Sequence, residues 1–216
     1  MPAEPFVVFD VDDTLYLERD YVASGFAAIE PLARSRFGVT GFAATAWDLF
    51  SAGARGDIFD RALVSMGVSC TPAEVASLVS AYRRHRPRIA LLPDARAAVR
   101  GRPFALLTDG PVLSQANKIR ALSVAQQASL VVLTGRYRGK FGKPHPRGFR
   151  EIAERSGADR LAYVADNPAK DFAAPRALGW RTVRVRRRGG LHADVPHGDD
   201  VDVVVDDLSD LAGALR

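Results

Sequence analysis

The stretch from Phe6 to Tyr16 constrains the fold of this chain more than any other part of the sequence. Four apolar residues, Phe6 to Phe9, come directly before Asp10. An unbroken apolar run is typical of a strand buried on both faces of a parallel sheet. A charge inside such a sheet is unfavourable, so Asp10 must lie where the strand ends. In open α/β sheets this carboxyl end of the strands is where ligands bind.

A second carboxylate, Asp12, follows Asp10 after one residue. Residues two apart in an extended chain point the same way. Two carboxylates held close together repel each other, and each raises the other's proton affinity unless a cation lies between them. The stretch therefore indicates a hard divalent metal such as Mg²⁺, or a shared proton. The alternative is a plain turn in which Asp12, Asp13 or Thr14 caps the next helix.

Composition limits the classes of protein that the chain can belong to. Its 216 residues fit one large domain or a domain with an insertion, and the single cysteine, Cys70, cannot form an internal disulfide. No signal peptide and no apolar run of the roughly 20 residues that span a membrane are found. We therefore expect a cytoplasmic protein without a membrane partner. The oligomeric state stays open.

The net charge of +5 has two interpretations. It favours an anionic partner, either a phosphorylated small molecule or a nucleic acid, or else it reflects a solvated surface rich in arginine. No pattern of aromatic and basic residues typical of nucleic-acid recognition is present. We therefore expect no nucleic-acid partner.

After Tyr16 the apolar residues follow helical spacing for about seventy residues. One helix is expected from Tyr21, with a kink or break near Pro31. Thr71-Pro-Ala-Glu74 has the residues of a helix start, with a Thr cap, Pro at the first position and Glu three residues after the cap. The helices are expected at 42–50, 57–66 and from Thr71 to about Arg84. Residues 17–90 thus form an all-helical block.

Strands and helices alternate in the rest of the chain. This alternation predicts an α/β fold with a doubly wound parallel sheet, into which the helical block is inserted. The catalytic core would comprise residues 1–16 and 91–216, and the insertion residues 17–90. Further strands are expected at 104–107, 130–133, 161–165, 181–185 and 202–205, and helices at 93–99, 112–122, 146–155, 171–178 and 208–215.

Polar residues follow several of these predicted strands. Thr108 comes before Asp109 and Gly110, and its hydroxyl with nearby backbone N–H groups could hold a phosphate oxygen. Lys143 lies among prolines ahead of a helix and could neutralise carboxylates or bind phosphate. Asp166 would face the same crevice as Asp10. Each has an ordinary alternative: a turn at Thr108, a solvated surface lysine at 143, and a helix cap at Asp171 after Asp166.

Taken together, these residues resemble the motifs of the haloacid dehalogenase superfamily. The four motifs are matched by Asp10-Val-Asp12-Asp-Thr14, Thr108, Lys143, and the pair Asp166 and Asp171. The resemblance covers nearly the whole chain, because the helical block resembles the family's first-position cap. Two positions depart from it. Ala165 replaces a common Gly, and Asp109 replaces a common Asn or Gly, which is unfavourable beside phosphate unless its side chain points away.

The resemblance implies a role for each matched residue. Asp10 would be the nucleophile and Asp12 the general acid and base. Mg²⁺ would be bound by Asp10, Asp166 and the backbone carbonyl of Asp12. Thr108, Asp109 and Lys143 would hold the phosphoryl group. Thr14 and Asp171 would support the site, with Asp171 positioning Lys143 or a metal-bound water.

Asp12 also selects a reaction within the superfamily. Dehalogenating and phosphonate-cleaving relatives lack this second Asp, because they have no alkoxide leaving group to protonate. The expected function is therefore Mg²⁺-dependent hydrolysis of a small phosphate monoester, a sugar phosphate or a nucleotide, through an aspartyl-phosphate. The alternatives are a phosphomutase and a non-catalytic binding or regulatory module.

Basic residues are candidates for substrate specificity. Arg19 lies near the hinge of the predicted cap, Arg55 in a loop of the cap, and Arg136 before Lys143 in the core. Two further basic runs have ordinary interpretations, although residues 83–86 are also a candidate for substrate recognition in the cap. We expect residues 83–86 to be a solvated helix end and residues 184–188 to belong to a surface hairpin.

Overall fold

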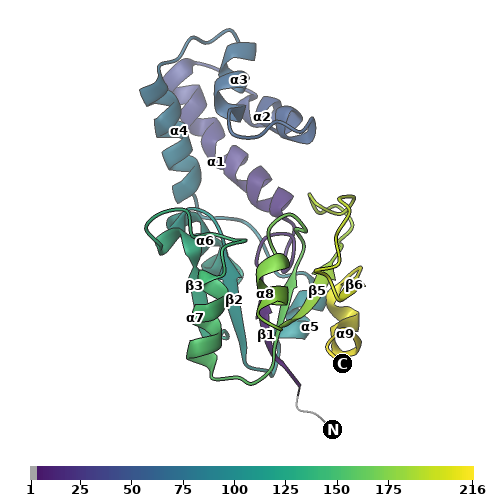
Figure 1. Cartoon of the computed structure of the whole chain (residues 1–216). Coiled ribbons are helices and arrows are strands. Elements are labelled where there is room, and N and C mark those ends of the chain that lie inside the picture. The colour runs from purple at the N-terminus through teal and green to yellow at the C-terminus, as the bar shows by residue number, and fades with distance from the viewer. Residues whose placement is uncertain (1–3) are drawn as a thin grey trace. The chain divides into compact units, whose positions relative to one another are not determined.

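A computed structural model of the chain describes residues 4–216 (Figure 1). The chain divides into two compact units. One contains the residues up to Arg19 and from Ile89 onward, and the other contains Asp20–Arg88. The second unit is entirely helical and loop, with every strand in the first. The sequence predicted an inserted block at residues 17–90.

The first unit is built on a six-stranded sheet with the order β3-β2-β1-β4-β5-β6. All neighbouring strands are parallel, as expected where each strand is followed by a crossover. The predicted doubly wound α/β fold is therefore confirmed. The strands are β1 (Phe6–Phe9), β2 (Phe104–Thr108), β3 (Leu130–Leu133), β4 (Leu161–Ala165), β5 (Arg181–Val185) and β6 (Val203–Val205).

The helices of this unit agree with the predicted alternation. The C-terminal helix is divided, because Asp207 caps a 3₁₀ turn, η2 (Leu208–Asp210), before the final helix. The other elements are α5 (Pro93–Val99), α6 (Val112–Ala121), η1 (Thr134–Arg136), α7 (Arg147–Ser156), α8 (Ala173–Ala177) and α9 (Leu211–Ala214).

The sheet is buried on both faces, as the apolar strands predicted. On one face Val8, Leu107 and Tyr163 belong to a buried cluster with Phe149 of α7. Helices α7 and α8 lie on the same side of the sheet in Figure 1. On β1 the next side chain, Phe9, points to the opposite face and makes an edge contact with Phe104, with ring centroids 5.9 Å apart.

The helical unit has its own aromatic core. The ring of Phe26 in α1 lies 6.4, 6.0 and 6.0 Å from the rings of Phe50, Phe59 and Tyr82, measured between centroids. Gly25 is needed there because a Cβ at that position would overlap the Tyr82 ring. The helices are α1 (Glu18–Phe37), α2 (Phe42–Ser51), α3 (Ile58–Ser65) and α4 (Pro72–Arg84).

Two sequence predictions in the helical unit have different outcomes. The helix start at Thr71 is confirmed as a capping box, with Glu74 N donating to Thr71 Oγ1 at 3.3 Å and Thr71 N to Glu74 Oε2 at 2.8 Å. Of the kink or break expected near Pro31, the break is wrong, because α1 runs on to Phe37, and the kink stays a prediction. The buried side chains of Ile29 and Ala33 on either side of Pro31 hold the helix in place.

The prediction of a surface hairpin at residues 184–188 is also wrong. Strand β6 pairs with β5 in parallel, with Val183 opposite Val203, whereas a hairpin would pair them antiparallel. Arg184 and Arg187 are buried, and Arg186 and Arg188 are exposed. The basic run is therefore part of the core unit rather than a solvated turn.

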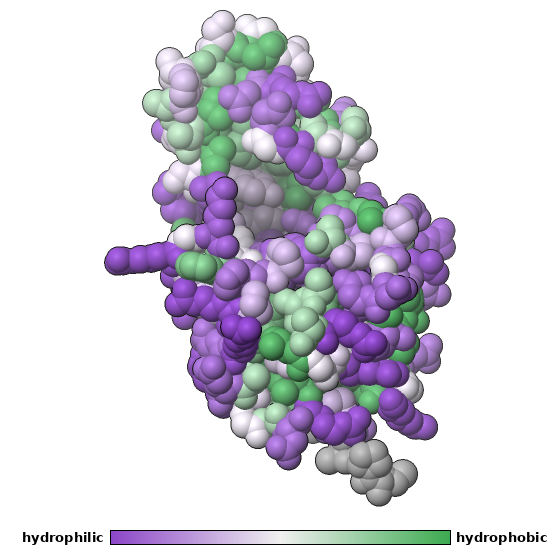
Figure 2. All heavy atoms as spheres, in the orientation of Figure 1, coloured by the Kyte–Doolittle hydropathy of each residue, from purple (hydrophilic) through white to green (hydrophobic). Residues whose placement is uncertain are grey.

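The surface of the α/β unit seen in Figure 2 is mainly hydrophilic, with hydrophobic side chains in small separate areas. Across residues 4–216 we find no helix that combines the length and the apolar character needed to cross a membrane.

Candidate active site

The first strand delivers Asp10 to the carboxyl edge of the sheet. Its backbone N donates to Val164 O of β4 at 2.9 Å, which fixes the end of β1 against its neighbour. Asp13 then takes a left-handed conformation, with φ of 51°, which Asp tolerates better than most residues. The Asp13 carboxylate accepts bonds from Glu18 N and Leu191 N, both at 2.8 Å. These bonds fold the loop back over the strand end.

Lys143 connects two of the predicted acidic residues. Its Nζ lies 2.8 Å from Asp10 Oδ1 and 2.7 Å from Asp171 Oδ1, and it donates to Tyr163 OH at 2.9 Å. All four side chains are buried. The other oxygen of Asp171 accepts a bond from Asn167 N at 3.0 Å. Asp171 thus contacts both Lys143 and the loop that follows β4, as a residue that positions Lys143 would.

Three carboxylates gather where β1 and β4 end. Asp10, Asp166 and Asp171 are buried and each offers an oxygen within 4.8 Å of the others. Among residues 4–216, Lys143 is the ammonium that forms ion pairs with this group, through Asp10 and Asp171. Three negative charges against one positive charge leave a deficit that a divalent cation would balance, and carboxylate oxygens are the ligands that Mg²⁺ prefers. The donor set therefore fits the predicted metal.

The proton affinities of these groups reflect the same imbalance. Burial raises the pKa of Asp10 to about 6, against the opposing effect of Lys143. Burial, with repulsion from Asp10 and Asp171, raises the pKa of Asp166 well above its usual range. Burial would lower the pKa of Lys143, but Asp10 and Asp171 more than offset this and raise it. Lys143 stays charged, and its charge, with the weaker effect of Lys170 on Asp10, does not offset the burial of the carboxylates.

The raised pKa of Asp10 predicts a pH-dependent stability difference in metal-free protein. The folded state favours protonated Asp10. The contribution of this protonation to the stability of the folded state is complete below the ordinary pKa of 3.8 and is lost as pH rises through about 6. Asp10→Asn cannot ionise. Between pH 4 and pH 7 it should therefore gain about 2 kcal/mol of unfolding free energy relative to wild type.

Urea unfolding in the presence of a chelator measures this difference. The exposed Asp60→Asn substitution in the helical unit serves as the control. A constant difference between Asp10→Asn and wild type across this pH range would contradict the prediction.

Asp12 has a different environment from Asp10. Lys118 Nζ lies 2.7 and 2.9 Å from its two carboxylate oxygens, and Gln115 Nε2 donates to Oδ2 at 3.0 Å. Tyr16 OH donates to Oδ1. Burial would raise the pKa of Asp12, but Lys118, with the hydrogen bonds from Tyr16 and Gln115, more than offsets this and lowers it. Asp12 is thus held in its ionised form.

The residues after β2 face in two directions. Thr108 is buried and its hydroxyl donates to Gln115 Oε1 at 3.0 Å. The Asp109 carboxylate accepts from Thr134 Oγ1 at 2.6 Å and from Lys143 N at 3.2 Å. The unusual carboxylate of Asp109 is therefore used to fix the loop before Lys143. This removes the objection to an extra negative charge at this position.

The structure brings seven of the predicted residues into one region through direct contacts or proximity, including Asp109, which contacts Lys143. Asp10, Lys143, Asp166 and Asp171 form the buried cluster, and Thr108 is connected to Asp12 through Gln115. The Thr14 hydroxyl is buried, with no hydrogen-bond partner within residues 4–216.

The three predicted specificity residues are exposed. Arg55 donates to the carbonyls of Phe50 and Ala54 at 3.0 and 2.6 Å and lies over the Phe50 ring. A Cβ on Gly189 would lie 3.6 Å from Nη1 of Arg19. Arg136 ends η1, in the segment before Lys143. Their part in specificity stays a prediction.

Sequence reasoning missed Gln115, Lys118, Tyr163 and Arg187. Gln115 and Lys118 are three residues apart and so share one face of α6. Polar residues with this spacing ordinarily form the solvated face of a helix, so the pattern carries no signal for a buried site. Tyr163 reads as an apolar residue of β4.

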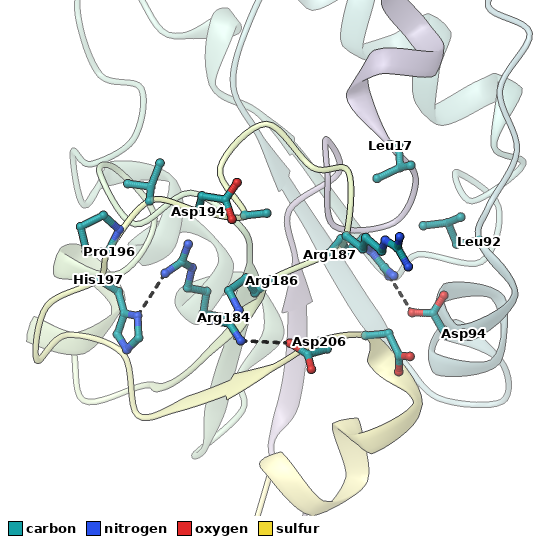
Figure 3. A pocket seen from close by; sticks show the side chains of 14 residues that line it. Leu17, Leu92, Asp94, Arg184, Arg186, Arg187, Asp194, Pro196, His197 and Asp206 are labelled. Atoms are coloured by element: carbon teal, nitrogen blue, oxygen red, sulfur yellow. Dashed lines mark hydrogen bonds and ion pairs between the residues drawn. The ribbon is translucent and has the colours of Figure 1, made fainter.

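Two buried arginines, Arg184 and Arg187, contact the loops that follow β1 and β4 and line a pocket shown in Figure 3. Arg187 donates from Nε and Nη2 to Thr14 O at 2.8 and 2.6 Å, and its Nη2 pairs with Asp94 at 2.7 Å. Arg184 donates to Asp166 O at 3.3 Å and to His192 O at 2.7 Å. They form part of the wall of an open pocket of about 1020 Å³.

Arg187→Met should destabilise the fold strongly. It leaves the Thr14 carbonyl and the Asp94 carboxylate without their buried partner, and losing one member of a buried pair costs about 3 kcal/mol or more. Arg188→Met is a matched control, because Arg188 is the exposed neighbour of Arg187 and should change the free energy of unfolding by less than about 0.5 kcal/mol. Equal effects in urea titrations would contradict this assignment.

Comparison with known proteins identifies the family. Residues 6–179 match the haloacid dehalogenase-like hydrolase family. The chain belongs to this family. It is 35% identical over 202 residues to a phosphoserine phosphatase from Thermus thermophilus, an alignment that covers 89% of this chain and 77% of that protein. The family resemblance seen in the four motifs is thus confirmed.

Solved structures share the fold across the family. A putative hydrolase of the family from Bacillus subtilis, bound to magnesium, has a TM-score of 0.71 at 16% identity, with 100% of both chains covered. An L-2-haloacid dehalogenase from Xanthobacter autotrophicus has a TM-score of 0.63 at 19% identity, with 99% of both chains covered. One fold therefore serves different reactions, and the choice between them depends on the residues of the site.

Proposed function

We propose that this protein is a Mg²⁺-dependent phosphatase that hydrolyses a small phosphate monoester, a sugar phosphate or a nucleotide, through an aspartyl-phosphate on Asp10. The observation that carries this proposal is the buried cluster of three carboxylates, Asp10, Asp166 and Asp171, around the ammonium of Lys143. Such a site suits a divalent cation and a phosphoryl group that approach the same carboxylate.

The proposed metal site consists of Asp10, Asp166 and the backbone carbonyl of Asp12. The charge deficit of the carboxylate cluster supports it, as does the magnesium in the related structure from Bacillus subtilis. When bound, Mg²⁺ would neutralise charge between the carboxylates and the phosphoryl oxygens.

Asp10 would act as the nucleophile. A carboxylate oxygen of Asp10 forms a bond to phosphorus while the bond from phosphorus to the leaving oxygen breaks. Lys143, already 2.8 Å from Asp10, would hold a phosphoryl oxygen, together with the Thr108 hydroxyl and the backbone N–H of Asp109. Because the Thr108 hydroxyl donates to Gln115 at 3.0 Å, it would have to turn toward the phosphate when substrate binds.

Asp12 would transfer the protons. In the first step it gives a proton to the leaving oxygen, and in the second it takes one from the water that attacks phosphorus and releases Asp10. The lowered pKa of Asp12 favours the ionised form that the second step needs. Asp12 must therefore take up a proton before the first step. This second carboxylate supports a phosphate ester over the substrates of dehalogenating relatives.

The substrate assignment rests on the helical unit and on the relatives. We propose that residues 17–90 act as a cap that selects the substrate, with Arg19, Arg55 and Arg136 as candidates for its recognition. The match to a phosphoserine phosphatase over most of the chain supports a small phosphorylated metabolite.

Release of phosphate from p-nitrophenyl phosphate with Mg²⁺ tests the proposed activity, followed by a panel of sugar phosphates, nucleotides and phospho-amino acids. Hydrolysis of one class with the highest kcat/KM identifies the substrate. Isomerised sugar phosphate with little free phosphate would indicate a mutase instead. The absence of any turnover by folded protein with Mg²⁺ would overturn the assignment as an enzyme of this type.

A further inference from the structure

The Asp12 carboxylate is held by three side chains. Lys118 contacts both of its oxygens, at 2.7 and 2.9 Å, while Gln115 and Tyr16 each donate to one. The side chain of Lys118 is 4% exposed and that of Asp12 is 19% exposed. A buried ammonium with two contacts to one carboxylate restricts its rotation.

Gln115 and Lys118 both belong to α6, the helix that follows Thr108. Helix α6 begins at Val112, and Gln115 and Lys118 face the same side of it, both buried. Gln115 Oε1 also accepts a hydrogen bond from the Thr108 hydroxyl. The Gln115 amide therefore connects Thr108, which is proposed to bind phosphate, to Asp12. The two proposed catalytic carboxylates thus have separate lysines, with Lys143 at Asp10 and Lys118 at Asp12.

We propose that Lys118 and Gln115 are positioning residues that fix the Asp12 carboxylate in the orientation needed for proton transfer to and from the reacting oxygens. The proposal rests on the phosphatase activity proposed above. An acid or base acts only within hydrogen-bond reach of its proton, and a displacement of about 1 Å can reduce the rate about 10²-fold. Lys118 contacts both carboxylate oxygens of Asp12, so we expect its removal to act on proton transfer more than on substrate affinity.

Lys118→Met tests the proposal through two leaving groups. With saturating Mg²⁺, kcat for phenyl phosphate should fall about 10²-fold with KM changed less than about 3-fold. The loss should be smaller for p-nitrophenyl phosphate, because nitrophenolate needs less protonation to leave. Lys118→Arg, which keeps the charge and two donors, should recover part of the rate. Arg120→Met is the matched control on the same helix, since Arg120 is exposed.

A double-mutant cycle separates positioning from a direct role. In an Asp12→Asn background Lys118→Met should cause less than about a 2-fold further loss, because its effect passes through Asp12. A full further loss, or a rise in KM with kcat unchanged, would overturn the proposal. Equal losses for both leaving groups would also overturn it, since a general loss of structure affects them alike.

Gln115→Leu gives a second route if Lys118→Met does not fold. It keeps the ion pair between Lys118 and Asp12 but removes one donor, and should reduce kcat for phenyl phosphate about 10-fold with the same dependence on leaving group. A wild-type rate for Gln115→Leu would overturn the role of Gln115. If wild-type protein hydrolyses neither ester, the proposed function itself fails, which is distinct from a variant with unchanged kinetics.

Discussion

Asp10→Asn is expected to reduce kcat for p-nitrophenyl phosphate by at least about 10⁴-fold, because the amide cannot attack phosphorus to form the aspartyl-phosphate. The substitution keeps the size of the side chain and an oxygen that Lys143 Nζ, 2.8 Å away in wild type, can still contact. The loss should therefore appear in kcat, with substrate binding largely retained. Phosphate release in the presence of Mg²⁺ measures the rate.

The stability of the same variant is its internal control. Metal-free Asp10→Asn should be at least as stable as wild type at pH 7, since it removes a buried carboxylate whose pKa is raised to about 6. Loss of activity in a protein of undiminished stability would locate the effect in the chemistry. Turnover by Asp10→Asn within about 10-fold of wild type would mean that another group is the nucleophile.

Asp166→Asn is expected to raise the Mg²⁺ concentration for half-maximal activity by at least about 10-fold and to lower kcat by about 10²-fold or more. Asp166 is buried within the carboxylate cluster, and its carboxylate forms no salt bridge with a Lys or Arg among residues 4–216. Removal of one negative charge weakens the attraction for a divalent cation. Activity should likewise disappear in EDTA and return when Mg²⁺ is added.

Asp159→Asn is the matched control for Asp166→Asn. Asp159 is exposed and lies before β4, at the opposite end of the strand from Asp166. Its substitution should leave both kcat and the Mg²⁺ requirement unchanged. An activity that resists EDTA, or an identical Mg²⁺ response in Asp166→Asn and wild type, would contradict the proposed metal site.

The sequence predicted the central residues of the site because the same local signal recurs at several strand ends. Apolar strands that end in acidic or hydroxyl residues, as at Asp10, Thr108 and Asp166, place those residues on one edge of a parallel sheet. The order of the motifs then indicated the family, which the comparisons confirm. That Lys143 pairs with Asp10 and Asp171 could also be predicted from the sequence, because these residues belong to the recognised motifs.

Other features depended on contacts between distant segments. The hairpin expected at 184–188 was wrong because strand direction is set by pairing, and β5 pairs with β6 in parallel. Nothing local to Arg187 indicates that it bonds to the Thr14 carbonyl. The orientation of the Asp109 carboxylate likewise depends on Thr134, from a different loop.

The sequence by itself determined the α/β fold, its helical insertion and the acidic strand ends, because these follow from periodicity and from the cost of burying charge. Only the tertiary structure showed that Asp12 has a lysine of its own. Asp10 and Asp12 are two residues apart, yet Lys143 pairs with one and Lys118 with the other. Pairing depends on distances of a few ångströms between side chains far apart in the chain, and sequence spacing carries no such information.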